Sequence, residues 1–135
     1  MKKIILLLLT FGILFASSIN AETVLYCKSE LATGFAKVDG KWKIGNFAPA
    51  RFTIKFNDNF SRIEGGLPES SPMECDVPFD SLTNVIHCVS TNYNRSTMRY
   101  DIESKRFVHY FNPARGYISS SADTDLLYAG TCEIF

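Results

Sequence analysis

The sequence predicts a small, exported, all-β domain that folds as an antiparallel meander and is stapled by disulfides. Apolar and polar residues alternate with a period of two along most of the chain, and turn residues recur about every 8–12 positions. Four cysteines lie in a chain of 135 residues. No segment shows the sustained 3.6-residue period of an amphipathic helix. We therefore expect a closed or partly open barrel of about eight to ten strands, with a β-sandwich as the alternative.

The start of the chain predicts a secretory signal peptide. A basic start and an apolar run from Ile4 to Phe15 are followed by small residues that end at Ala21. This order is typical of a cleaved export signal. We expect removal of residues 1–21 and one domain over residues 22–135. The alternative is a membrane anchor, but the run is shorter than the roughly 20 apolar residues that span a bilayer.

The charge of the exported part excludes some classes of partner. Lys2 and Lys3 lie in the signal, so residues 22–135 carry 12 basic and 14 acidic side chains, a net charge of −2. This balance provides no electrostatic attraction to nucleic acid or anionic lipid. The sequence contains no second apolar run long enough to cross a membrane. We expect a bacterial periplasmic or secreted protein with no nucleic-acid partner and no membrane anchor after cleavage.

The cysteines predict two disulfides, because an even number in a small exported chain is typical of a disulfide framework. Of the three pairings, we favour Cys27–Cys132 and Cys75–Cys88. The first pair lies in the first and last expected strands, which become neighbours when a barrel closes. The second pair flanks a segment that suits a hairpin. Zinc is the alternative, but no C-x-x-C or H-x-x-x-H pair is present. We expect no metal and no cofactor.

The first half of the domain predicts a strand over 23–29 and then a tight hairpin. The pair Asp39-Gly40 suits a two-residue turn in which both residues have positive φ. This turn pairs Phe35 with Ile44 and puts both side chains on the same face as Trp42. The three residues therefore form one apolar patch.

Alternation or apolar character predicts the remaining strands at 51–56, 60–64, 85–89, 97–102, 106–111, 117–118 and 126–135. We expect the phenylalanines of 51–56 and 106–111 to point inward. Gly130 indicates a bulge or tight bend in the last strand. Residues 65–72 predict a loop, and 29–33 and 79–84 are candidates for a single helical turn.

No catalytic grouping is predicted. His87 and His109 are the two histidines, and each is a candidate general base or metal ligand. Both lie in apolar strand patterns, with no acid at a telling spacing. Ser119-Ser120-Ser121 lacks the G-x-S-x-G pattern of a nucleophile elbow. We interpret Asp123 and Asp125 as turn residues rather than calcium ligands.

The sequence favours a non-enzymatic binding module for a protein or other macromolecule of the cell envelope. Tyr93 and Arg95 lie in a polar turn, and Tyr117 lies beside another turn. These residue types are favoured at interface hot spots. One alternative is a barrel that carries a small apolar molecule, although we expect the phenylalanines to fill so small a barrel. An enzyme with a site at His87 and His109 is the other alternative.

The pair Tyr26-Cys27, together with Cys132, resembles the small periplasmic inhibitors of c-type lysozyme. The resemblance implies an exported β-barrel with a disulfide between the chain ends and an inhibitor-like function. Residues 42–45 resemble the tryptophan-glycine segment of that family but lie earlier in the chain. The serine-bearing loop that precedes the segment in the family is not recognisable here. The resemblance therefore concerns the class of protein.

Overall fold

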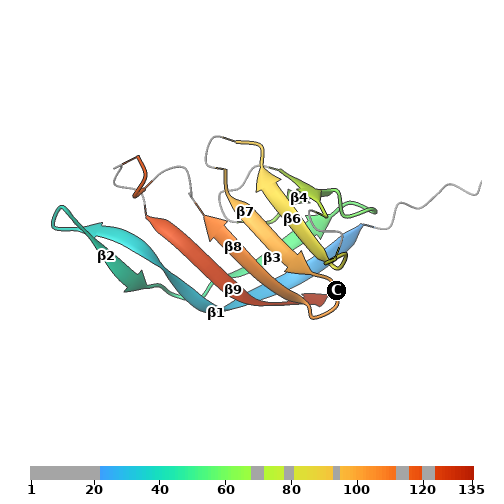
Figure 1. The fold of residues 1–135 in the computed structure, drawn as a ribbon. Helices are drawn as coiled ribbons and strands as arrows, with labels where there is room; N and C mark the ends of the chain where they lie inside the picture. The colour runs from blue at the N-terminus through green and yellow to red at the C-terminus, as the bar shows by residue number, and fades with distance from the viewer. Residues whose placement is uncertain (1–21, 68–71, 78–80, 93–94, 112–115, 120–123) are drawn as a thin grey trace, which may run out of the picture.

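The computed structural model describes residues 22–67, 72–77, 81–92, 95–111, 116–119 and 124–135 (Figure 1). Every regular element in these ranges is a β-strand. The described residues contain no helix that is long and apolar enough to cross a membrane. The prediction of an all-β fold is confirmed. The expected signal peptide at 1–21 lies outside the described residues, as do Tyr93, Asp123 and the tip of the loop expected at 65–72.

Within the described ranges, one antiparallel sheet contains nine strands. In chain order these are β1 (Thr23–Val38), β2 (Lys41–Asn46), β3 (Arg51–Phe56), β4 (Arg62–Gly65), β5 (Met73–Asp76), β6 (Val85–Ser90), β7 (Thr97–Asp101), β8 (Arg106–Phe111) and β9 (Asp125–Ile134). All strands except β2 form the closed barrel, because β9 returns to pair with β1. The β1–β2 hairpin extends away from the barrel (Figure 1). The barrel expected from the sequence is confirmed.

Alternating side chains fill the barrel interior. Phe52, Ile54 and Phe56 of β3 are buried, as their alternation predicts. Rings from opposite parts of the barrel meet inside it: Phe52 lies 5.3 Å from Phe107, and Phe56 lies 5.9 Å from Tyr100, between centroids. Such edge and stacked contacts add about 0.5–1.5 kcal/mol each to the effect of burial. The barrel is therefore a packed scaffold for its outer surface.

Strand β1 is longer than the sequence predicts, and the expected helical turn over 29–33 is wrong. The strand runs for 16 residues. Its pairing with β9 shifts by one residue at Glu30, where a β-bulge interrupts the register. Cys27 and Ser29 point inward before the bulge, whereas Ala32 lies on the inward side after it. Because the alternation of the sequence changes phase at Glu30, the pattern suggests that the strand ends there, although the strand continues.

Gly130 lies opposite the bulge, where β1 and β9 approach each other closely. A Cβ atom at this position would collide with the carbonyl oxygen of Lys28. The expectation of a bulge at Gly130 was therefore right about the place, but the extra residue belongs to the facing strand β1. Only glycine allows the two backbones to approach at this point.

The strand expected at 117–118 is also wrong, because residues 116–119 form a turn. Gly116 has a φ of 63°, in the left-handed region that glycine adopts readily. The Tyr117 N–H donates to Oδ2 of Asp125 at 3.1 Å. A side-chain carboxylate thus takes the place of a neighbouring strand as the acceptor.

The two disulfides are those expected from the sequence. Cys27–Cys132 joins β1 directly to β9 and closes a span of 105 residues. Cys75–Cys88 joins β5 to β6 across a span of 13 residues. Two disulfides and no free cysteine are consistent with an oxidising, extracellular environment.

The two bridges are expected to stabilise the fold unequally, because loop-closure entropy grows with the length of the closed loop. Replacing Cys27 and Cys132 by alanine should lower the free energy of unfolding by about 4–5 kcal/mol, and replacing Cys75 and Cys88 by about 3 kcal/mol. Urea unfolding of the two double variants without reductant measures both losses. A larger loss from the Cys75–Cys88 pair would contradict this account.

Gly130→Ala should destabilise the barrel, because its methyl group has no room against β1. We expect a loss of about 2 kcal/mol or more, as for other overpacked sites. Gly65→Ala is the matched control, since a Cβ there meets no atom within 4 Å. Urea midpoints of the two variants provide the comparison. Equal midpoints would show that β1 can move away from Gly130 at little cost.

Candidate functional site

The structure does not bring the two histidines together. His87 lies on the outer face of β6, and its Nδ1 is 3.8 Å from Oδ1 of Asp76. His109 lies on β8 and points into the barrel, where it is 1% exposed. The wall of the barrel separates the two rings, so they do not form a shared acid–base or metal site.

His109 serves as part of the core. Its ring lies 6.3–6.4 Å from the rings of Phe52, Phe111 and Tyr128. Neither ring nitrogen has a hydrogen-bond partner among the described residues. Burial lowers the pKa of His109 from 6.5 to about 4, so the imidazole is neutral near pH 7.

Asp101 has a structural role in the turn that follows β7. The carboxylate of Asp101 accepts hydrogen bonds from the backbone N–H groups of Glu103 at 2.9 Å and Ser104 at 3.2 Å. These bonds stabilise the charged form and lower the pKa of Asp101. Among the described residues, no group of three or more His, Cys, Asp or Glu side chains is placed to hold a metal ion.

The outer face of the β1–β2 hairpin offers a different kind of site. Asp39 and Gly40 have φ values of 52° and 75°, as the predicted turn requires. The turn pairs Phe35 with Ile44 and Lys37 with Trp42, in the register expected from the sequence. The apolar side chains of this face remain accessible: Ile44 is 78% exposed and Phe35 is 43% exposed. A large exposed apolar surface is unusual on a small soluble domain.

Tyr117 completes this surface from a distant part of the chain. Its ring centroid lies 5.9 Å from that of Phe35 and 5.5 Å from that of Trp42. The hydrogen bond from its N–H to buried Asp125 holds the turn of residues 116–119 against the first residue of β9. Asp125 is in turn the cross-strand partner of Phe35. We call Phe35, Trp42, Ile44 and Tyr117 the hairpin patch.

The described residues of the hairpin patch line at least two cavities. One, of about 450 Å³, is lined by all four patch residues and Lys43. The other, of about 280 Å³, is bounded by Phe35 and Ile44 on one side and by Tyr110 and Leu127 on the other. Burial and the nearby charge of Asp125 raise the pKa of Tyr110. Open apolar cavities of this kind accept side chains of a partner.

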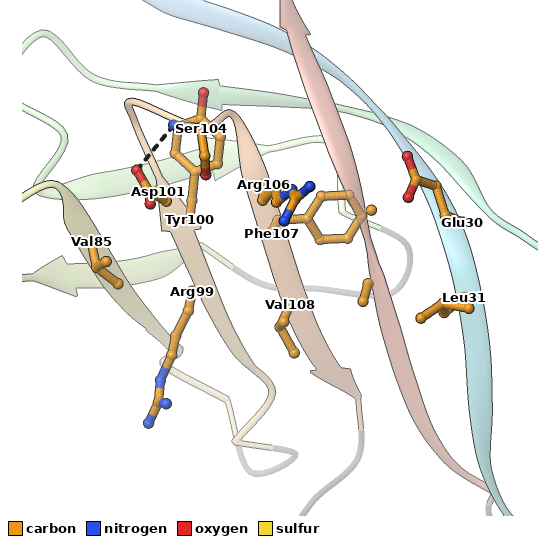
Figure 2. Close-up of a pocket in the computed structure, with 12 residues that line it drawn as sticks. Glu30, Leu31, Val85, Arg99, Tyr100, Asp101, Ser104, Arg106, Phe107 and Val108 are labelled. Atoms are coloured by element: carbon orange, nitrogen blue, oxygen red, sulfur yellow. Dashed lines mark hydrogen bonds between the residues drawn. The ribbon is translucent and has the colours of Figure 1, made fainter.

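A third cavity, of about 660 Å³, lies beside the hairpin patch on the same outer surface. Figure 2 shows Arg99, Arg106 and Val108 on β7 and β8, with Glu30 and Leu31 on β1 across the groove. Leu31, Ala129 and Val108 follow one another in register across three strands. Apolar residues thus alternate here with charges of both signs.

The hairpin patch and this groove form one surface. Cross-strand pairing sets Thr33 beside Leu127 and Leu127 beside Tyr110, in the row between the two regions. Because side chains two residues apart share a face of a strand, the adjacent rows are continuous. An apolar strip therefore runs from β2 across β1 and β9 to β8.

The binding residues expected from the sequence are only partly united by the structure. Tyr117 belongs to the hairpin patch. Arg95 is exposed in the turn after β6, with a φ of 52°, whereas Tyr117 lies in the turn after β8. Tyr93 lies outside the described residues. The hairpin register predicts the grouping of Phe35, Trp42 and Ile44, but gives no sign that the group stays exposed.

No family model matches the chain, and neither a curated protein nor a solved structure is significantly similar to it. Its function is therefore argued from the geometry of its own residues.

The buried imidazole of His109 is expected to make the protein sensitive to acid. Its folded pKa of about 4 lies below the usual 6.5, so the unfolded chain binds the proton more tightly. The neutral imidazole therefore makes its full contribution to the free energy of unfolding above pH 6.5. As the pH falls towards 4, the free energy of unfolding decreases by up to about 3 kcal/mol. His109→Phe should remove this loss. Urea unfolding between pH 7 and 4 measures it.

The control for this measurement is His87→Phe, at a site on the outer face of β6. This variant should keep the acid sensitivity of the unchanged protein. A His109→Phe variant that still loses the same stability between pH 6.5 and 4 would contradict the assignment to His109.

Proposed function

We propose that this protein is an exported, non-enzymatic binding module that engages another protein through the hairpin patch. The observation that carries the proposal is the cluster of exposed Phe35, Ile44 and Tyr117 around half-buried Trp42, on a disulfide-stapled barrel. The signal peptide expected at residues 1–21 would deliver the chain to the periplasm or outside the cell. The disulfides fit this oxidising environment.

The chemistry of the side chains favours binding over catalysis. The two histidines lie on opposite sides of the barrel wall. The Asp101 carboxylate accepts backbone hydrogen bonds within its own turn. By contrast, the hairpin patch is held in place before any partner arrives, because β1 pairs with both β2 and β9 and the Asp125 bond positions Tyr117. Such preorganisation lowers the entropic cost of association.

The shape of the hairpin patch favours a protein partner. The ring planes of Trp42 and Tyr117 are inclined by 69°, and those of Phe35 and Tyr117 by 38°. The rings therefore form no flat platform for a stacked base or sugar. They surround cavities that suit aliphatic or aromatic side chains. Aromatic residues in such positions commonly dominate the energy of protein interfaces.

The charges of the hairpin indicate the character of the partner. Lys37, Lys41 and Lys43 surround its tip, against the single acid Asp39. The Lys37 ammonium lies 6.0 Å from the Trp42 ring centroid, so positive charge stands directly beside the apolar surface. A partner with acidic residues next to apolar ones would match both features, and opposite charges would accelerate the encounter.

Site-specific photo-crosslinking tests the location of the binding surface. A photoreactive residue at position 44 or 117, introduced in the cells that make the protein, should capture one and the same partner. The control position is Leu82, which is 51% exposed in the connection between β5 and β6 and should not capture it. Capture that is equally strong from position 82 would contradict the proposal.

Truncating the rings should weaken the captured complex. Trp42→Ala and Tyr117→Ala should each raise the dissociation constant about tenfold or more, as expected for aromatic hot spots. Tyr26→Ala is the matched control, since Tyr26 is a half-exposed aromatic residue at the other end of β1. Affinities that are unchanged in both patch variants would overturn the proposed function.

A further inference from the structure

Strand β2 ends the sheet. Its six residues pair only with the second half of β1, and no strand among the described residues lies along its other edge. In the part of the chain that the structure describes, the other eight strands close upon themselves and leave no comparable edge. An open strand edge exposes unpaired backbone groups that another extended chain can use.

The turn determines which backbone groups of β2 face outward. In a two-residue hairpin the residues that flank the turn, here Val38 and Lys41, exchange hydrogen bonds. Hydrogen-bonded and non-hydrogen-bonded pairs then alternate along the two strands. The N–H and C=O groups of Trp42 and Ile44 consequently point away from β1, towards the open edge.

The same two residues also contribute their side chains to the hairpin patch. Trp42 and Ile44 thus present backbone groups along the edge and apolar side chains on the adjoining face. Lys41 and Lys43 are exposed on the opposite face of β2. A strand added to this edge would meet apolar side chains on one of its faces and positive charges on the other.

We propose that the partner binds by strand addition: an extended segment of about six residues pairs with β2 through Trp42 and Ile44. Its apolar side chains enter the hairpin patch, and the acidic residues that alternate with them lie beside Lys41 and Lys43. This inference rests on the proposed function and specifies the partner as a segment of alternating apolar and acidic residues.

The charges disfavour a second copy of this chain as the occupant. Pairing two β2 edges would place Lys41 and Lys43 of both copies on one face of a joint sheet, where like charges repel. The same lysines repel basic segments and provide no opposite charge to neutral ones. The lysines therefore favour an acidic strand over basic and neutral ones.

A synthetic peptide provides a direct test. The probe is a blocked decapeptide in which valine alternates with aspartate or glutamate, and the control peptide replaces the acids by lysine. The acidic peptide should slow hydrogen exchange of the Trp42 and Ile44 amides at least tenfold, as measured by NMR. The lysine peptide should not. Absence of protection at both amides in millimolar acidic peptide would overturn strand addition.

Two matched variants separate the backbone contribution from that of the side chain. Ile44→Ala and Ile44→Pro both remove the isoleucine side chain, but only proline removes the N–H at the open edge. Proline is tolerated on edge strands. We expect Ile44→Pro to bind the acidic peptide about five- to tenfold more weakly than Ile44→Ala, as for one lost hydrogen bond. Equal affinities would contradict strand addition.

Modified peptides make the test independent of how the proline variant folds. N-methylation of the peptide residues whose N–H groups face β2 should abolish binding, whereas methylation of the alternate residues should not. Equal binding by both peptides overturns strand addition but leaves the proposed function standing if Trp42→Ala still weakens the natural complex. A β2-mediated dimer of the protein in size-exclusion chromatography would instead identify a second copy as the occupant.

Discussion

The register between β1 and β9 is the constraint on which the rest of the structure depends. It closes the barrel, and it is held by the direct pairing of Cys27 with Cys132 and by the close backbone approach at Gly130. The first half of β1 pairs with β3, and the second half pairs with β2. Since β9 pairs with both halves of β1, the β1–β2 hairpin continues the wall of the barrel. The pairing that stabilises the barrel therefore also fixes the position of the strand that carries Phe35.

A single inserted residue decides which side chains that surface presents. Before Glu30 the inward positions are Leu25, Cys27 and Ser29. Had the alternation continued, Leu31 and Phe35 would also point inward, because a shift of one residue exchanges the two faces of a strand. The bulge reverses the phase and turns both residues outward, onto the apolar strip. The candidate binding surface and the closed barrel thus follow from one local irregularity in β1.

The sequence predicts the local features of the structure well and its non-local ones poorly. Period-two alternation identifies β3 and β8, and Asp39-Gly40 identifies the hairpin with its register. The bulge at Glu30 escapes prediction because it depends on β9, about a hundred residues further along the chain. Tyr117 is misassigned to a strand for a similar reason, since the carboxylate that holds its turn lies eight residues later. The pattern groups the hairpin residues correctly, but exposure depends on which strands cover them, and alternation alone does not contain that information.

The combination of an open edge with apolar side chains is one that folded proteins usually avoid. Exposed edges with hydrophobic flanks promote aggregation, and lysine is a common protection against it. Here Lys41 and Lys43 occupy the edge strand, yet Trp42 and Ile44 beside them remain available. A purely protective edge would carry polar residues on both faces. Because the charged side chains of β2 itself lie on one face, the edge repels copies of itself while keeping an apolar surface for a partner of opposite charge, which is the arrangement that selective strand addition requires.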